Sequence, residues 1–219
     1  MVIHQLKILL LKDIRLELKQ KYAINGILLY VLSTVFVSFL SFERILDGKT
    51  WNALFWIILL FSAVNAVSKS FVQEGQPRQL YYYTIVSPLA LILSKILYNA
   101  LLMGIISLLC FGAFVVFLGN MVESTPLFLF TILLGGWGFS GVLTMVSAIA
   151  SRTSNNFALM AILSFPVVLP ILLIVMKVTN AALNGGGFAD NWSPLMALFL
   201  LNIMIAALAS VLFPYLWKD

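Results

Sequence analysis

Apolar residues occur along this chain in six long, continuous runs, and short polar connections separate each run from the next. An α-helix needs about 20 mainly apolar residues to cross a bilayer, which is close to the length of the shorter runs. Because the runs do not alternate apolar with polar residues, they predict helices and not the strands of a membrane barrel. We expect six transmembrane helices, at residues 24–42, 51–71, 88–118, 126–150, 157–178 and 194–217.

Three of these runs begin with a hydroxyl residue followed by proline, namely Ser87-Pro88, Thr125-Pro126 and Ser193-Pro194. A hydroxyl side chain can accept a hydrogen bond from an amide of the first helical turn, and proline suits the first position because it has no amide hydrogen. We therefore expect these pairs to mark helix starts. The run at residues 88–118 is too long for one straight crossing, and we expect its first turns, up to Lys95, to lie in the membrane interface.

The segment before the first run, residues 1–23, has the pattern of an amphipathic helix. Its apolar residues recur at helical spacing and form one stripe, at Ile3, Leu6, Leu10, Ile14 and Leu18. The basic residues Lys12, Arg15 and Lys19 fall on the opposite side. Such a helix lies along the membrane surface with its basic face near anionic lipid headgroups, and it either only anchors the chain or also serves a partner. We expect an all-α protein in which residues 1–219 form one domain, with the six spans in residues 24–217.

Composition and charge place the chain in the membrane and orient it. Of its residues, 62% are hydrophobic and 10% are charged, with a mean hydropathy of +1.07, which leaves too little polar surface for an ordinary soluble domain. Ten of the 13 Lys and Arg residues fall in the terminal segments and in the second and fourth connections. Cationic residues favour the cytoplasmic side, so we expect both termini in the cytoplasm. The net charge of +5 is explained by this orientation and indicates no nucleic-acid partner.

Several kinds of site are disfavoured by what the sequence lacks. Cys110 is the single cysteine and His4 the single histidine, so no disulfide, metal cluster or axial haem ligand is indicated, and we expect no bound cofactor. No G-x-x-x-x-G-K-[ST] motif occurs, so we expect no ATPase site in this chain and no enzyme activity of its own. Residues 136–141 match G-x-G-x-x-G but lie inside an apolar run, where glycines favour close helix packing. We assign that packing role to Gly136, Gly138 and Gly141.

The second polar connection, residues 69–87, is richer than a simple link between spans. Gly75 and Pro77 end the preceding helix, and Pro77 can begin a short helix that contains Arg78 and a run of three tyrosines. Tyrosines are ordinary at a membrane interface, but that does not explain the turn at Glu74, Gly75 and Arg78. We interpret this turn as a docking surface for a soluble partner.

The fifth run contains Pro166 and Pro170, which are four residues apart and therefore on one face of a helix. Each proline removes a backbone hydrogen bond and bends the helix. Two interpretations stay open: the pair acts as a hinge that transmits motion, or it only bends the helix for packing.

Short motifs along the chain resemble the CcmB family, the haem-exporter permeases of cytochrome c maturation. Residues 12–17, K-D-I-R-L-E, are similar to the K-D-L-R-x-E stretch of that family. Residues 71–75, F-V-Q-E-G, with S-P at 87–88 and S-K at 94–95, resemble its connection between the second and third spans, which other ABC-2-type permeases share loosely. Residues 165–170, F-P-V-V-L-P, are similar to its paired prolines. The resemblance covers nearly the whole chain.

The resemblance implies a permease subunit of an ABC transporter complex for cytochrome c biogenesis in the bacterial inner membrane. The implied partners are a separate ATP-binding-cassette ATPase, a second copy of the chain and haem-handling membrane subunits, with haem as the cargo of the complex. ATPase docking is then assigned to Glu74, Gly75, Arg78, Asp13, Arg15 and Glu17. Residues 76–79 depart from the more acidic pattern of the family. Two alternatives stay open: an ABC-2-type exporter of a lipid or drug, and a non-transporting membrane scaffold.

Overall fold

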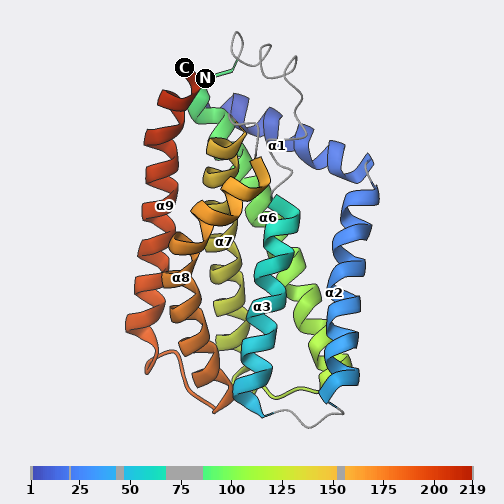
Figure 1. Cartoon of the computed structure of the whole chain (residues 1–219). Helices are drawn as coiled ribbons and strands as arrows, with labels where there is room; N and C mark the ends of the chain where they lie inside the picture. Colours follow the sequence, from blue (N-terminus) through green and yellow to red (C-terminus); the bar gives the residue numbers. More distant parts are fainter. Residues whose placement is uncertain (1, 20, 43–46, 68–85, 152–155, 219) are drawn as a thin grey trace.

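The structure, a computed structural model, describes residues 2–19, 21–42, 47–67, 86–151 and 156–218. Seven helices account for nearly all of this part of the chain, and no strand occurs in it. They are α1 (Val2–Lys19), α2 (Lys21–Phe42), α3 (Gly48–Val67), α6 (Pro88–Leu118), α7 (Thr125–Ala150), α8 (Asn156–Leu183) and α9 (Trp192–Lys218). Figure 1 shows their order and arrangement.

The six helices that follow α1 are long and apolar enough to cross a membrane. They run side by side as a bundle, and α1 lies across one end of it (Figure 1). Both chain termini lie at that end, which we call the terminal end. The structure therefore confirms the six predicted spans and the all-α fold class, and an even number of crossings returns the chain to the end where it began.

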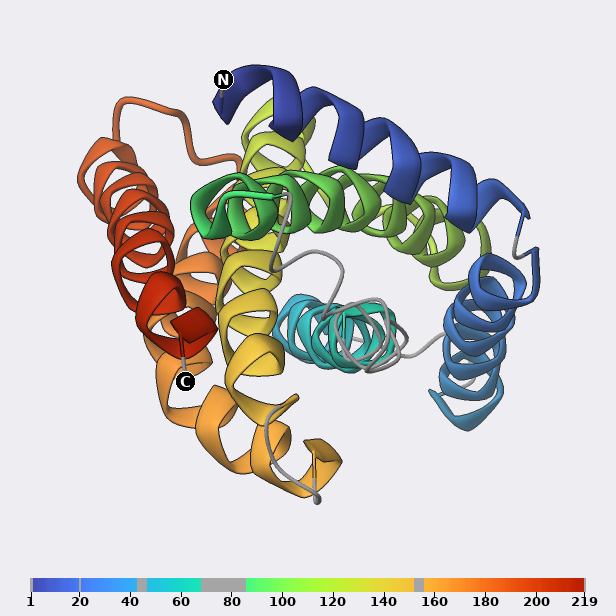
Figure 2. The same ribbon diagram turned by 90° about the horizontal axis from the view of Figure 1, so that it is seen from above.

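Helix α7 is the centre of the bundle. It contacts α3, α6, α8 and α9. Of its spanning segment 78% is buried, against 11% for α2, which stands at the edge of the bundle (Figure 2). Glycine, serine and threonine are frequent along α7, and such small residues let neighbouring helices approach closely within a membrane. The composition of α7 therefore accounts for its central position.

Helix α6 is continuous over 31 residues, which corresponds to about 46 Å at 1.5 Å per residue. This length exceeds the roughly 30 Å of hydrocarbon in a bilayer. Seen from above, α6 lies obliquely across the bundle whereas α3 is viewed nearly end-on (Figure 2). A tilted helix can accommodate the excess length, so the long run does not require a separate interfacial segment before Lys95.

The structure confirms one of the three predicted helix starts and corrects the other two. Ser87 precedes α6, and its hydroxyl oxygen accepts a hydrogen bond from the amide of the third helical residue at 3.4 Å. Thr125 already belongs to α7, so Ser124 is the N-cap residue, and it forms no side-chain cap bond. Helix α9 begins at Trp192, because the carbonyl of Asn191 accepts the first helical hydrogen bond at 3.1 Å. Proline is tolerated throughout a first turn, where amides lack helical partners, so it does not identify the first residue.

Other helix boundaries differ modestly from the predicted ones. Helices α2 and α3 each begin three residues earlier than expected, and α8 continues five residues beyond the expected end at residue 178. The expected end of the second span, at residue 71, lies outside the described residues. Asp47 precedes α3, and its carbonyl accepts a hydrogen bond from the Trp51 amide at 3.0 Å. A side-chain hydrogen bond from Thr50 to the Asp47 carboxylate lowers the pKa of Asp47.

The buried apolar side chains form two separate clusters. The main core fills the bundle and includes a group of large rings, in which Trp51 stacks on Phe55 with centroids 5.9 Å apart and Phe114 meets Phe55 edge-on at 5.3 Å. A smaller group, which we call the terminal cluster, joins α1, α6, α7 and α9 at the terminal end. Its members are Leu9, Ala90, Leu91, Ile92, Ala148, Ala209 and Phe213. Leu9 is the member that α1 contributes, so α1 is joined to the bundle through this cluster.

Candidate functional site

Helix α1 packs chiefly on α6. Leu9 and Asp13, one turn apart, are the buried positions, with 5% and 6% of their surface exposed. Leu6, Leu10 and Ile14 of the predicted apolar stripe are only half-buried. A charged residue, Asp13, thus lies on the most buried side of α1, and the apolar stripe lies beside it.

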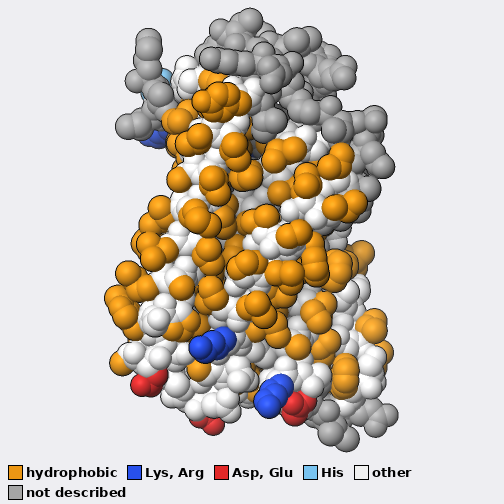
Figure 3. Space-filling view, turned by 60° about the vertical axis from the view of Figure 1, so that its left-hand side comes forward, with side chains coloured by type: hydrophobic (Ala, Val, Ile, Leu, Met, Phe, Trp, Pro, Cys, Tyr) orange, Lys and Arg blue, Asp and Glu red, His pale blue; other side chains and the backbone are white. Residues whose placement is uncertain are grey.

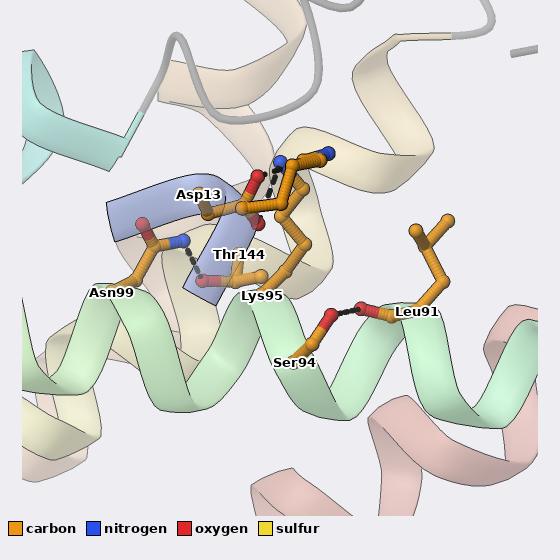
Figure 4. A network of polar contacts seen from close by, with 7 residues as sticks. Asp13, Leu91, Ser94, Lys95, Asn99 and Thr144 are labelled. Atoms are coloured by element: carbon orange, nitrogen blue, oxygen red, sulfur yellow. Dashed lines mark hydrogen bonds and ion pairs between the residues drawn. The ribbon is translucent and has the colours of Figure 1, made fainter. Parts of the chain in front are cut away.

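Buried Asp13 forms an ion pair with a lysine of α6, which makes its burial tolerable. Its Oδ2 atom lies 3.3 Å from Lys95 Nζ, and its Oδ1 atom lies 3.0 Å from Lys12 Nζ (Figure 4). The side chains of Asp13 and Lys95 are each 6% exposed. A buried charge is very costly unless it is paired, and removing one partner of a buried pair costs about 3–5 kcal/mol. The pair therefore holds α1 against α6.

A second polar contact continues this connection from α6 to α7. Asn99 lies one helical turn after Lys95, and its Nδ2 atom donates a hydrogen bond to Thr144 Oγ1 at 2.8 Å (Figure 4). Asn99 and Thr144 are 1% and 0% exposed, so the bond lies inside the bundle. Polar contacts thus join α1 to α6 and α6 to α7 within two turns of the same helix.

Helix α1 is fastened to α6 at one further point. The hydroxyl and the amide of Ser87 both donate hydrogen bonds to Gln5 Oε1, at 3.0 and 3.3 Å. Gln5 and Asp13 are eight residues apart, and so are Ser87 and Lys95. The two helices therefore run in the same direction and in register over about 12 Å, and Figure 2 shows α1 alongside α6. Leu9, midway between the two contacts, packs in the terminal cluster.

The structure describes three of the six residues that we assigned to ATPase docking, Asp13, Arg15 and Glu17. The carboxylate of Asp13, which we expected to support docking from the N-terminal helix, is turned inward to Lys95. Arg15 is exposed on the outer side of α1, and Glu17 is half-buried. The turn containing Glu74, Gly75 and Arg78 lies outside the described residues. The docking assignment for these residues, and for Arg15 and Glu17, stays a prediction.

The three glycines assigned to helix packing face three different helices. Gly136 lies against α6, Gly138 against α8 and α9, and Gly141 against α9. A β-carbon at these positions would lie 2.8, 3.2 and 3.1 Å, respectively, from the nearest side-chain atom of the facing helix. The tightest site of α7 is a glycine that the motif did not include. At Gly135 a β-carbon would lie 2.7 Å from the Trp56 ring.

Pro166 and Pro170 lie on the exposed side of α8, away from the bundle. The opposite side of α8 packs in the main core through Val168, Ile171 and Val175. The prolines deprive two carbonyl groups on the exposed side of their helical donors. This placement is compatible with both interpretations of the pair, so the hinge stays a prediction.

A buried polar group at the far end of the bundle was not anticipated from the sequence. Asn52 of α3 donates a hydrogen bond to the carbonyl of Met176 at 3.0 Å, and it accepts one from the Thr179 hydroxyl at 2.8 Å. The indole nitrogen of Trp56 donates to the same hydroxyl at 2.9 Å. These bonds join α3 to α8. The only sequence signal was an amide or hydroxyl residue within an apolar run, and the same signal marks Asn99 and Thr144.

Within the described part of the chain, no group of three or more His, Cys, Asp or Glu side chains is placed to hold a metal ion. Cys110 is buried in α6 with no disulfide partner.

Six apolar spans, termini at one end and an amphipathic helix packed across that end define a multi-pass helical membrane protein. The sequence pattern of the CcmB protein family matches residues 4–215, which is nearly the whole chain. The chain therefore belongs to the CcmB family, the ABC transporter permeases of cytochrome c biogenesis, and the resemblance drawn from its motifs is confirmed. No curated protein sequence matches the chain.

Proposed function

We propose that this chain is the membrane permease of an ABC transporter complex in the bacterial inner membrane. In this proposal a partner ATPase drives haem export, or the release of haem to a periplasmic chaperone, for cytochrome c biogenesis. The observation that carries the proposal is the family match over residues 4–215. The six spans and the packed α1 helix agree with the architecture that such a permease needs.

The orientation that we propose places the terminal end in the cytoplasm. It is supported by the excess of Lys and Arg in the terminal segments and in the connections on that side. Hydrophobic side chains cover most of the face of the bundle that Figure 3 shows, and acidic and basic side chains occur together at the far end of that face. Exposed side chains such as Ile162 and Leu173 of α8, 71% and 69% exposed, suit a lipid environment.

The proposed energy source is a separate ATPase subunit, because the sequence contains no phosphate-binding loop of its own. We propose that the ATPase binds at the terminal end, where Arg15 of α1 is exposed. The connection with Glu74, Gly75 and Arg78 is the second proposed contact. A second copy of the chain would give twelve spans around a pathway, and haem-handling membrane subunits would complete the complex.

Purification of the tagged chain from native membranes tests this proposal. We expect an ATP-binding-cassette ATPase to copurify, its ATP hydrolysis to depend on the chain, and cytochrome c maturation to be lost when the chain is deleted. If maturation is unaffected by the deletion, the chain serves another cargo, such as a lipid or drug. If ATP hydrolysis does not depend on the chain, a scaffold role replaces the permease role.

The docking surface is tested separately by Glu74→Lys. We expect this variant to retain normal membrane levels but to lose ATP hydrolysis in the complex and cytochrome c maturation, because a cation replaces an anion at the proposed contact. Lys177→Glu, a charge reversal in the far half of α8, is the control and should leave ATPase binding unchanged. Full hydrolysis and maturation with Glu74→Lys would show that the docking assignment is wrong.

A further inference from the structure

A buried ion pair between α1 and α6 calls for a role beyond stability. Replacing a buried ion pair by apolar residues of similar size is often neutral or stabilising, so such a pair is weak evidence for a stabilising device. Ionisable residues within membrane spans are costly, and they commonly mark functional positions. Lys95 lies two turns into α6, and its Nζ atom is 3.3 Å from Asp13 Oδ2. An apolar pair would hold the helices together at lower cost.

The position of α1 makes it suited to transmit movement. Its principal contacts are with α6, and it has only a small contact with α2. It is joined to α6 by two polar contacts in register, Gln5 with Ser87 and Asp13 with Lys95. A displacement of α1 along the membrane surface therefore acts on α6 at these points. Apolar contacts at Leu9 are not directional and allow sliding, whereas the ion pair and the hydrogen bonds fix the register.

The next step in the connection leads to the centre of the bundle. Asn99 follows Lys95 by one turn on α6, and it is bonded to Thr144 of α7 at 2.8 Å. Helix α7 in turn contacts α3, α8 and α9. A movement that reaches α7 thus acts on helices on several sides of the bundle.

We propose that the Asp13–Lys95 ion pair is the joint that transmits ATPase-driven movement of α1 to α6, and that the Asn99–Thr144 bond passes it to α7. This inference rests on the proposed function, because it assumes that an ATPase acts on the terminal end. Asp13 and Lys95 are positioning residues in this scheme: they act through the helices and do not touch cargo. A coupling joint differs from a packing contact in one measurable respect. Removing it reduces the cytochrome c matured per ATP hydrolysed, while the complex stays assembled.

The test compares the purified complex of the natural chain with that of Asp13→Asn combined with Lys95→Met. The double variant leaves no unpaired buried charge at these two positions, and both replacements are close in size to the natural residues. We expect the thermal midpoint and the ATP hydrolysis rate to change little. The cytochrome c matured per ATP should fall about tenfold, which is within the usual range of coupling between sites. Lys7→Met removes an exposed cation from the same helix and is the matched control, with no expected change.

Two further variants keep the inference testable if the double variant loses the ATPase. Thr144→Val removes the hydroxyl that accepts from Asn99 without altering α1, and it should also lower the maturation per ATP. Asp13→Glu keeps the charge and should retain most of the coupling. Normal maturation per ATP in the double variant, or in Thr144→Val, would overturn the inference. If instead the complex of the natural chain shows no chain-dependent ATP hydrolysis, the proposed function itself fails, and the two failures are distinguishable.

Discussion

Replacing Gly135 by alanine tests how closely α7 is packed in the bundle. A β-carbon at Gly135 would lie 2.7 Å from Trp56 Cη2 and 2.9 Å from Val175 Cγ1. Carbon atoms in ordinary contact are about 3.5–4.0 Å apart, so the neighbours would have to move by roughly 0.6–0.8 Å or more. Trp56 and Val175 are both fully buried, and buried side chains are usually close-packed with few voids.

The expected loss of stability follows from two contributions. Overpacking of a filled core costs about 1–3 kcal/mol. Trp56 is also held by the hydrogen bond from its indole nitrogen to Thr179 at 2.9 Å, and losing such a bond costs about 1 kcal/mol. The higher helix propensity of alanine offsets up to about 1 kcal/mol. We therefore expect Gly135→Ala to lower the free energy of unfolding by about 1–3 kcal/mol.

The measurement is reversible unfolding of the purified chain in mixed micelles, compared with a matched glycine variant. Gly112 of α6 is exposed, and a β-carbon there would have no neighbour within 4 Å. Gly112→Ala should therefore be as stable as the natural chain, or slightly more stable. If Gly135→Ala were as stable as Gly112→Ala, the close packing of α7 on α3 and α8 would be refuted.

Three further predictions concern other parts of the chain. Asn52→Leu removes the side chain that joins α3 to α8, and it should lower the free energy of unfolding by about 1–3 kcal/mol in the same assay; an unchanged value would mean that this network adds no stability. The hydrogen bond from Thr50 lowers the pKa of Asp47 in the folded chain below its ordinary value of 3.8. The ionised carboxylate therefore stabilises the fold above that pH, and this stabilisation is lost as the pH falls through the pKa of the folded state. Asp47→Asn should thus lower the thermal midpoint at neutral pH, and the difference should vanish in acid; a difference independent of pH would contradict the reasoning. Replacing Pro166 and Pro170 together by alanine should reduce cytochrome c maturation at normal expression if the pair is a hinge, and undiminished maturation would leave only a packing role.

The transmembrane helices could be predicted because crossing a bilayer imposes one strong requirement on the sequence. Every span must be long and apolar, and each of the six runs contains a helix whose described limits lie within about five residues of the expected ones. Helix ends were less predictable. Ser124 and Asn191 precede helices one or two residues before the hydroxyl–proline pairs, because proline is accepted at several positions of a first turn.

The faces of the helices depend on partners that a single sequence does not identify. The apolar stripe of α1 includes Leu10 and Ile14, but the most buried positions are Leu9 and Asp13, and Asp13 is paired with Lys95. Asp13 looked like a surface charge among basic neighbours, and Lys95 looked like a lysine near the end of a span. Only the packing of α1 along α6 brings the two together, at positions far apart in the sequence.

The same limit applies to the glycines of α7. The G-x-G-x-x-G spacing drew attention to Gly136, Gly138 and Gly141, which all face other helices. Gly135 has the closest neighbour because a tryptophan of α3 lies opposite to it. The size of the facing side chain decides how much a glycine matters, and that size is set by tertiary packing.

The central claim, that the terminal end faces the cytoplasm and its ATP, is tested most directly by labelling single cysteines in intact cells. Cys110 is buried in α6 and can be replaced by alanine. A cysteine is then placed at His4 of α1 or at Asn184, after α8 at the far end, both of which are exposed. With a reagent that passes the outer membrane but not the inner one, we predict labelling at position 184 and none at position 4 until the inner membrane is permeabilised. Labelling of position 4 in intact cells, with position 184 protected, would place α1 on the side without ATP and contradict the account.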